Sequence, residues 1–200
     1  MTESRMPLRE AVQVLHRART DQVVITTMAS AREWMHLGQH PLDFIYAPSS
    51  MGQAPTLGLG IALAQPQRQV IVCNGDGGML MNLGTLVTIT AEAPENYILI
   101  VFDNGMYEVT GMQYTAAAPA ARRRNDPIAP CGIARSCGFR SVYEFSDLPA
   151  WEAGIADVLD AAGPTYVHLR VAPVPGAQVP RSPAPPPQRA REFAEALQQR

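Results

Sequence analysis

The chain of 200 residues has little of what several classes of protein depend on. Cysteine occurs only as Cys73, Cys131 and Cys137, and no spacing among the three is typical of a zinc site. So few thiols, odd in number, predict reduced cysteines without a disulfide framework. No apolar run reaches the length of a membrane span, and no signal peptide is visible. We therefore expect a cytoplasmic protein without a membrane partner.

A strong charge of either sign is also missing. Lys and Arg number 16 against 18 Asp and Glu, for a formal net charge of −2. That balance does not favour nucleic acid as a partner. The basic cluster Arg122–Arg124 is interpreted as a solvated loop, with attraction of an anionic substrate as the alternative. Neither a P-loop nor a G-x-G-x-x-G motif after the first predicted strand is found, so the common nucleotide-binding folds are disfavoured.

Apolar residues make up 46% of the chain, which is enough to bury a core. Strands are predicted over 23–27, 44–46, 70–73, 97–102, 139–143 and 165–171. Helices are predicted over 7–19, 30–37, 53–64, 79–91, 127–137 and 148–161. Continuous apolar strands between helices predict an α/β fold with a doubly wound, mostly parallel sheet and helices on both faces.

The last part of the chain differs in composition from the rest. Residues 1–172 are predicted to form one domain, and 173–200 an appendage with a proline-rich arm over 173–187. A final helix is predicted over 189–199, with Phe193, Ala194 and Leu197 available to dock on the domain.

Two glycine-containing turns follow neighbouring predicted strands. Gly75-Asp76-Gly77 comes after strand 70–73, and Asp103-Asn104-Gly105 after strand 97–102. Ligands of parallel sheets bind at the carboxyl ends of strands. A carboxylate and an amide oxygen suit Mg²⁺, while glycines and the start of the next helix let backbone N–H groups approach a diphosphate. Either turn alone is common, but together they predict a magnesium–diphosphate site.

These turns lie within a longer resemblance. The stretch GDGGMLMNLGTLVTITAEAPENYILIVFDNGMYEVTG resembles the cofactor signature of the thiamine diphosphate-dependent enzyme superfamily. With SSMGQAPTLGLGIALAQPQRQVIVCNGDG, TTMASAREW, GMQYT and GPTYVHLRVAP, the chain resembles the diphosphate-binding (C-terminal or beta) half of the sulfopyruvate and phosphonopyruvate decarboxylases. The resemblance implies a thiamine diphosphate- and Mg²⁺-dependent 2-oxoacid decarboxylase subunit that acts on a small anionic 2-oxoacid.

The resemblance also assigns roles to individual positions. It makes Asp76, the side-chain oxygen of Asn104 and the backbone carbonyl of Met106 the Mg²⁺ ligands. The cofactor-binding residues that it implies, besides Asn104 and Met106, are Ser30, Ser49, Met51, Gly75, Gly77, Gly78 and Tyr107. In that set Met51 bends the cofactor from below, with ordinary core filling as the alternative. Ser49 offers a backbone carbonyl to the aminopyrimidine.

Some positions depart from the family pattern. Asp103 replaces the first asparagine of the usual Asn-Asn pair, and Gln53 stands where histidine is expected. Met28 and Ala31 replace the glycine and serine expected around TTGxTS. These positions border the cofactor or the substrate, so the exact substrate stays open.

No catalytic residue is predicted in this chain. The resemblance implies that an activating glutamate lies on a pyrimidine-binding (alpha-type) partner subunit, in a hetero-oligomer. The four histidines, His168 among them, are expected to be structural or solvent-facing. A carboligase of the acetolactate synthase type and a non-catalytic cofactor-binding or regulatory subunit are the alternatives. Ferredoxin-linked oxidoreductases fit less well, since they often carry clustered iron–sulfur cysteines.

Overall fold

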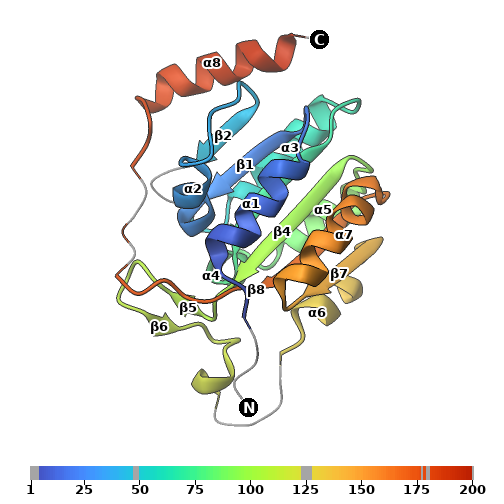
Figure 1. Cartoon of the computed structure of the whole chain (residues 1–200). Helices are drawn as coiled ribbons and strands as arrows, with labels where there is room; N and C mark the ends of the chain where they lie inside the picture. Colours follow the sequence, from blue (N-terminus) through green and yellow to red (C-terminus); the bar gives the residue numbers. More distant parts are fainter. Residues whose placement is uncertain (1–4, 47–49, 123–127, 177, 179–180, 200) are drawn as a thin grey trace.

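The fold is built on one parallel sheet, in a computed structural model that describes residues 5–46, 50–122, 128–176, 178 and 181–199 (Figure 1). Six strands lie in the order β2-β1-β3-β4-β8-β7, and every neighbouring pair is parallel. The strands are β1 (Val23–Thr27), β2 (Asp43–Tyr46), β3 (Val70–Gly75), β4 (Tyr97–Asp103), β7 (Ser141–Phe145) and β8 (Thr165–Arg170). The predicted α/β class with a parallel sheet is confirmed.

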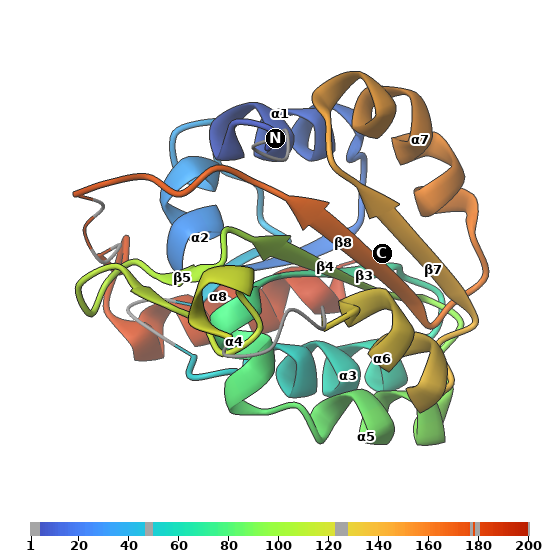
Figure 2. The same cartoon turned by 90° about the horizontal axis from the view of Figure 1, so that it is seen from below.

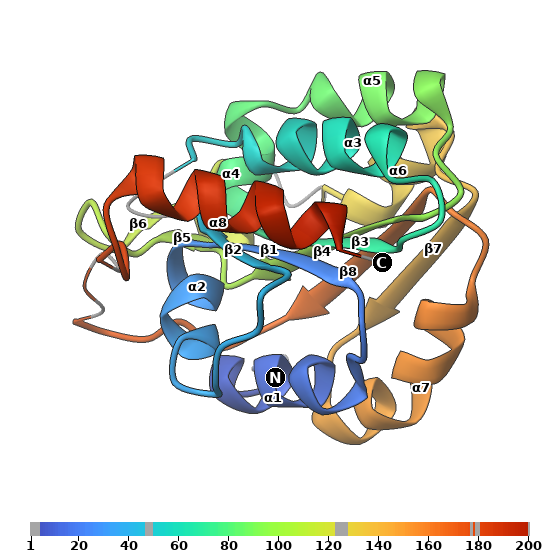
Figure 3. The same ribbon diagram turned by 90° about the horizontal axis from the view of Figure 1, so that it is seen from above.

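Helices cover both faces of this sheet (Figures 2 and 3). One face carries α1 (Leu8–Ala18), α2 (Met28–Trp34) and α7 (Leu148–Asp160). The other carries α3 (Ala54–Ala64), α4 (Asp76–Met81), α5 (Thr85–Glu92) and α6 (Pro130–Cys137). Successive strand residues alternate between the two cores: Ile71 packs under α1, and Val72 packs under α3. Because both faces are covered, the central strands are apolar throughout rather than alternating.

The predicted helix 79–91 is wrong as a single element. α4 begins at Asp76 and ends at Met81, and α5 begins only at Thr85. Asn82 lies at the break, where its side-chain amide donates to the carbonyl of Gly52 at 3.2 Å. That tertiary contact, with Gly84 following closely, interrupts a helical pattern that looked continuous in the sequence.

Other predicted bounds shift by a few residues. α2 begins at Met28, before the predicted start, and β7 begins at Ser141 rather than at Phe139. Gly138 explains the second shift, because its φ of +105° ends α6 in the left-handed conformation that glycine adopts readily. Phe139 then packs edge-on against Tyr166 before the strand begins.

A short antiparallel hairpin after β4 was not predicted. It pairs β5 (Met106–Tyr107) with β6 (Gln113–Tyr114), and a 3-10 turn, η1 (Pro119–Ala121), follows. The hairpin lies beyond the carboxyl ends of the central strands (Figure 1). It therefore brings residues after Asp103 back over the edge of the sheet where ligands bind.

The final helix, α8 (Pro186–Gln198), packs on the edge strand β2. The rings of Phe44 and Phe193 lie 5.0 Å apart, and the Arg189 guanidinium stacks on Phe44. Phe193 docks as predicted, but Ala194 is exposed and Ala196 is buried in its place. Helical spacing explains the correction, since positions three apart share a face. Among the described helices, none combines the length and apolarity needed to cross a membrane.

Candidate functional site

A cavity of about 320 Å³ opens at the carboxyl ends of β1, β3 and β4. It lies where the strand order reverses, because the chain leaves β1 toward one face through α2 and leaves β3 toward the other through α4. Such switch points leave a crevice above the sheet, which is the usual ligand site of doubly wound folds.

The cavity gathers the predicted site residues from four separate segments. Those that line it are Ser30, Met51, Gly75, Asp76, Gly77, Gly78, Asn104, Met106 and Tyr107. Ser49 and two arginines of the Arg122–Arg124 cluster lie outside the described residues. The predicted site residues that the structure describes therefore lie close together at one cavity. The role of each of them in binding stays a prediction.

Asp76 is the most unusual titratable group in the cavity. The residue is 5% exposed, and its carboxylate accepts a hydrogen bond from the Thr115 hydroxyl at 3.0 Å. This bond and the nearby backbone N–H groups of Gly77 and Asn104 lower the pKa of Asp76. Burial and the charge of Asp103 nevertheless raise the pKa of Asp76 to about 7. A divalent cation beside the carboxylate would favour its ionised form again.

This pKa predicts how the metal-free protein responds to pH. Because the folded pKa of Asp76 lies above its ordinary value of 3.8, the protonated group stabilises the fold; this contribution is complete below about pH 4 and is lost as pH rises through about 7. A pKa moved from 3.8 to about 7 corresponds to roughly 4 kcal/mol. Urea unfolding should therefore show the free energy of unfolding of metal-free wild type falling over this window more steeply than that of Asp76→Asn. Identical pH profiles would contradict this.

Asn104 lies in a tight turn that faces Asp76. Its side-chain oxygen accepts the N–H of Met106 at 2.8 Å, and the Asp103 carboxylate accepts the N–H of Gly105 at 2.8 Å. Gly105 has a φ of +74°, which glycine adopts without strain. An amide oxygen has a second lone pair, so Asn104 keeps one acceptor site. A carboxylate, an amide oxygen and the Met106 carbonyl are hard oxygen donors, and this donor set fits Mg²⁺.

The glycines of the first turn differ in what requires them. A Cβ atom at Gly77 would lie 2.6 Å from the Tyr107 ring, and one at Gly78 would lie 2.7 Å from Asn74 Oδ1. At Gly75 a Cβ atom would meet nothing within 4 Å. Close packing therefore excludes side chains at Gly77 and Gly78, and it places Tyr107 directly beside the bare backbone that the diphosphate is predicted to approach.

Two methionines at the cavity have strained backbones. Met28 and Met51 have φ values of +49° and +48°, in the left-handed region that disfavours side chains with a Cβ atom. The strain at Met28 explains why the family pattern has glycine there. Met51 is 62% exposed, so core filling, the alternative interpretation of this residue, does not fit. Gln53, the other departure nearby, is an exposed residue at the start of α3.

Ser30 has a structural task of its own. Its hydroxyl donates to the Thr27 carbonyl at 2.8 Å and accepts the Thr27 N–H at 3.3 Å, which caps α2. Ser30 lines the cavity, but its hydroxyl already forms the hydrogen bonds of this cap. A diphosphate contact from Ser30 therefore competes with a local hydrogen bond.

Sequence reasoning missed the partner of Asp103. His168 is buried, and its Nε2 lies 2.9 Å from Asp103 Oδ2. Burial raises the pKa of Asp103, but His168, Arg5 and the Gly105 N–H outweigh it and hold that pKa below its ordinary value. His168 comes from β8, which neighbours β4 only after the chain has passed through β7. The unusual aspartate thus pairs with a buried histidine, which fits the structural role expected of His168.

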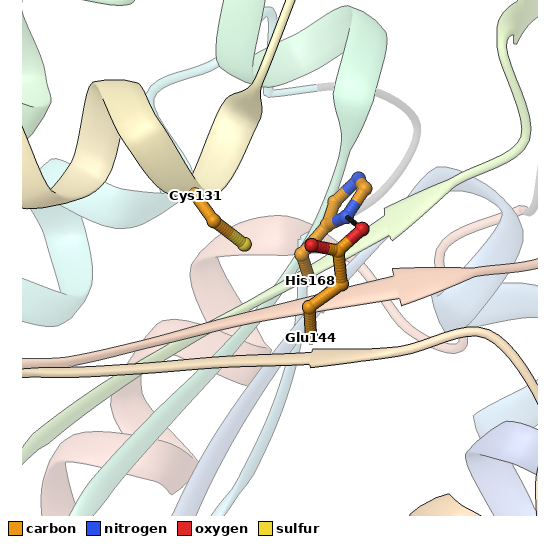
Figure 4. A group of neighbouring side chains, drawn as sticks. All are labelled: Cys131, Glu144 and His168. Atoms are coloured by element: carbon orange, nitrogen blue, oxygen red, sulfur yellow. Dashed lines mark ion pairs between the residues drawn. The ribbon is translucent and has the colours of Figure 1, made fainter.

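His168 also belongs to a second group of polar side chains, with Cys131 and Glu144 (Figure 4). One possible ligand atom each of Cys131, Glu144 and His168 lies within 4.8 Å of the others, a grouping that could hold a metal ion and that the cysteine spacing did not predict. Glu144 is also paired with Arg170 at 2.9 Å. Burial and the charge of Glu144 raise the pKa of the Cys131 thiol to about 11, so the thiol is protonated at neutral pH.

Known proteins share both the sequence and the fold around this cavity. Residues 25–169 match the model of the C-terminal TPP binding domain of thiamine pyrophosphate enzymes. The chain belongs to this family. The predicted superfamily is therefore confirmed, and the TPP binding domain accounts for most of the described sheet.

Individual relatives refine the comparison. A phosphonopyruvate decarboxylase from Streptomyces hygroscopicus is 36% identical over 173 residues, covering 86% of this chain but 41% of that protein. The sulfopyruvate decarboxylase subunit beta of Methanothermobacter thermautotrophicus is 38% identical, covering 82% of this chain and 81% of the subunit. The chain thus spans about two fifths of the phosphonopyruvate decarboxylase and most of the separate beta subunit.

A solved structure agrees on the fold. A thiamin diphosphate-dependent enzyme from Mycobacterium smegmatis superposes with a TM-score of 0.68 at 21% identity, over 84% of this chain and 32% of that one. The TPP-binding α/β fold is therefore shared at low sequence identity.

Proposed function

We propose that this chain is the diphosphate-binding subunit of a thiamine diphosphate- and Mg²⁺-dependent 2-oxoacid decarboxylase, with a small anionic 2-oxoacid as substrate. The observation that carries the proposal is the meeting of Asp76, Asn104 and Met106 at one cavity of a TPP binding domain. The relatives named as phosphonopyruvate and sulfopyruvate decarboxylases support a substrate with a second anionic group.

In this proposal the chain anchors the cofactor and its metal ion, and it does not supply the group that activates the cofactor. Asp76, Asn104 and the Met106 carbonyl hold Mg²⁺, and the backbone around Gly75 faces the diphosphate. When bound, thiamine diphosphate supplies the electron sink for loss of carbon dioxide. Met51, in its strained backbone conformation, would support the bound cofactor. The remaining lining is largely apolar, with Leu8, Met81, Phe102, Val109 and Val171 contributing, and it excludes water from the reacting groups.

The activating glutamate is proposed to come from the partner subunit. Glu108 is the one glutamate among the described residues that line the cavity. Its Oε1 accepts the N–H of Val174 at 2.7 Å, and its Oε2 lies 3.9 Å from Arg32. Both oxygens of Glu108 thus hold the arm and a neighbouring arginine in place, which leaves it poorly suited to activate the cofactor.

The surface next to the cavity exposes apolar side chains of the kind that a partner subunit would cover. Met81 lines the cavity and is 50% exposed, and Val87 on α5 is 58% exposed. Other exposed apolar side chains on or beside α3 to α5 are Met51, Leu57, Leu63 and Leu83. Clustered exposed apolar side chains mark interaction sites. A partner on this surface would cover the open side of the cavity and place its glutamate beside the cofactor.

Val87→Glu tests this surface. A charge at an exposed helix position should change the free energy of unfolding by less than about 0.5 kcal/mol. Buried under a partner, the same charge should weaken association at least roughly tenfold, since an unpaired buried charge is costly. Analytical ultracentrifugation with the partner subunit measures the affinity, and Ala156→Glu, exposed on α7 at the opposite face, is the matched control. Wild-type association of Val87→Glu would remove this surface from the interface.

The reaction itself is tested with the assembled protein and a panel of 2-oxoacids. We expect carbon dioxide release from sulfopyruvate or phosphonopyruvate to exceed release from pyruvate. Product analysis with an added aldehyde separates a decarboxylase from a carboligase. Tight cofactor binding without turnover on any 2-oxoacid would favour a regulatory subunit and overturn the proposed activity.

A further inference from the structure

Thr115 joins the two loops that carry the proposed cation ligands. The residue is fully buried and follows β6, 39 positions after Asp76. Its hydroxyl donates to Asp76 Oδ2 at 3.0 Å, and its backbone N–H donates to the carbonyl of Gly105 at 2.9 Å. Gly105 separates Asn104 from Met106. One residue, through its side chain and its backbone, therefore fixes the Asp76 carboxylate relative to the turn that presents the other ligands.

The Thr115 hydroxyl takes up part of the acceptor capacity of Asp76. An ionised carboxylate offers about four lone-pair sites on its two oxygens. The Thr115 hydroxyl occupies one of about two sites on Oδ2. Without that hydroxyl both sites on Oδ2 would be open to a cation.

The number of open lone-pair sites on Asp76 Oδ2 bears on which cation the site accepts. Mg²⁺ demands a near-ideal octahedron and usually combines one or two carboxylates with phosphate oxygens and water. Ca²⁺ is larger, takes six to eight oxygens and accepts both oxygens of one carboxylate. We propose that Thr115 sets the metal selectivity of the site, because by occupying Oδ2 it confines Asp76 to a single-oxygen contact and so favours Mg²⁺ over Ca²⁺. The inference rests on the proposed function, which places a diphosphate-bound cation at Asp76.

Thr115→Val tests the inference, because it removes the hydroxyl and keeps the shape of the side chain. Binding is measured on the full chain with its partner subunit and saturating thiamine diphosphate, by displacement of bound Mn²⁺ with Mg²⁺ or Ca²⁺ in electron paramagnetic resonance. The valine variant should shift the ratio of the two dissociation constants toward Ca²⁺ by about five- to tenfold, since the carboxylate gains a free oxygen. Thr115→Ser should restore the wild-type ratio.

The controls separate selectivity from general damage. Thr165→Val makes the same change at another fully buried threonine, on β8 outside the cavity, and should leave the ratio unchanged. If Thr115→Val weakens both metals equally, Thr115 is only structural and the inference is overturned. If far-UV circular dichroism shows that the valine variant does not fold, Thr115→Ala carries the same test. Wild type that retains no Mn²⁺ in the presence of thiamine diphosphate refutes the proposed function instead.

Discussion

Asp76→Asn is expected to lower the Mg²⁺-dependent affinity for thiamine diphosphate about 100-fold or more, since loss of outer-shell partners alone typically costs 10- to 100-fold. The asparagine keeps the size of the side chain and an oxygen for Thr115, but it removes the negative charge that a divalent cation needs. Without the cation, the diphosphate would meet only backbone N–H groups at the start of α4. Isothermal titration calorimetry with and without Mg²⁺ measures the loss.

The fold should survive the Asp76→Asn change. A buried carboxylate whose pKa is raised to about 7 destabilises the metal-free protein at higher pH, so a neutral amide should match or exceed the stability of wild type. Asp157→Asn, on the exposed side of α7, is the matched control and should bind the cofactor like wild type. Retained affinity in Asp76→Asn would refute the assignment of Asp76 as a metal ligand.

The chain without a partner is expected to show at most about 1% of the decarboxylase activity of the assembled protein, because a missing general acid or base costs 10²- to 10⁴-fold. Glu108 is held by Val174 and Arg32, so it cannot readily replace a partner's glutamate. Without a partner over Met51 and Met81, which are exposed at the cavity, water also reaches the site and weakens its electrostatics.

Titration of the chain with an alpha-type subunit measures this dependence. The neighbouring open reading frame is the first place to seek that subunit. Carbon dioxide release should rise with added partner and saturate at a fixed stoichiometry. A partner whose activating glutamate is replaced by glutamine is the control and should assemble without restoring the rate. Full activity of the homogeneous chain would show that the activating group lies within it.

Much of the site could be predicted because its residues are local to strand ends. Asp76 and Asn104 each follow an apolar strand, and parallel strands bring their carboxyl ends to one edge. Their meeting at one cavity follows from that rule alone, once β3 and β4 are known to be neighbours. The glycine at position 77 was likewise predictable as a place of close approach, although the packing against Tyr107 was not.

The contacts that tune the site were not predictable, because they join distant segments. Thr115 reaches Asp76 only through the β5–β6 hairpin, whose two-residue strands are too short for a periodic pattern. His168 reaches Asp103 because β8 inserts between β4 and β7. The break between α4 and α5 depends on the contact of Asn82 with Gly52. In each case a tertiary hydrogen bond overrides what the local sequence indicates.

A crystal of the assembled protein grown with thiamine diphosphate and Mn²⁺ tests the central claim most directly. We expect one anomalous peak, contacted by the Asp76 carboxylate, the Asn104 side chain and the Met106 carbonyl, with the diphosphate on its other side. A peak elsewhere, or cofactor bound in this cavity without a metal at Asp76, would contradict the account.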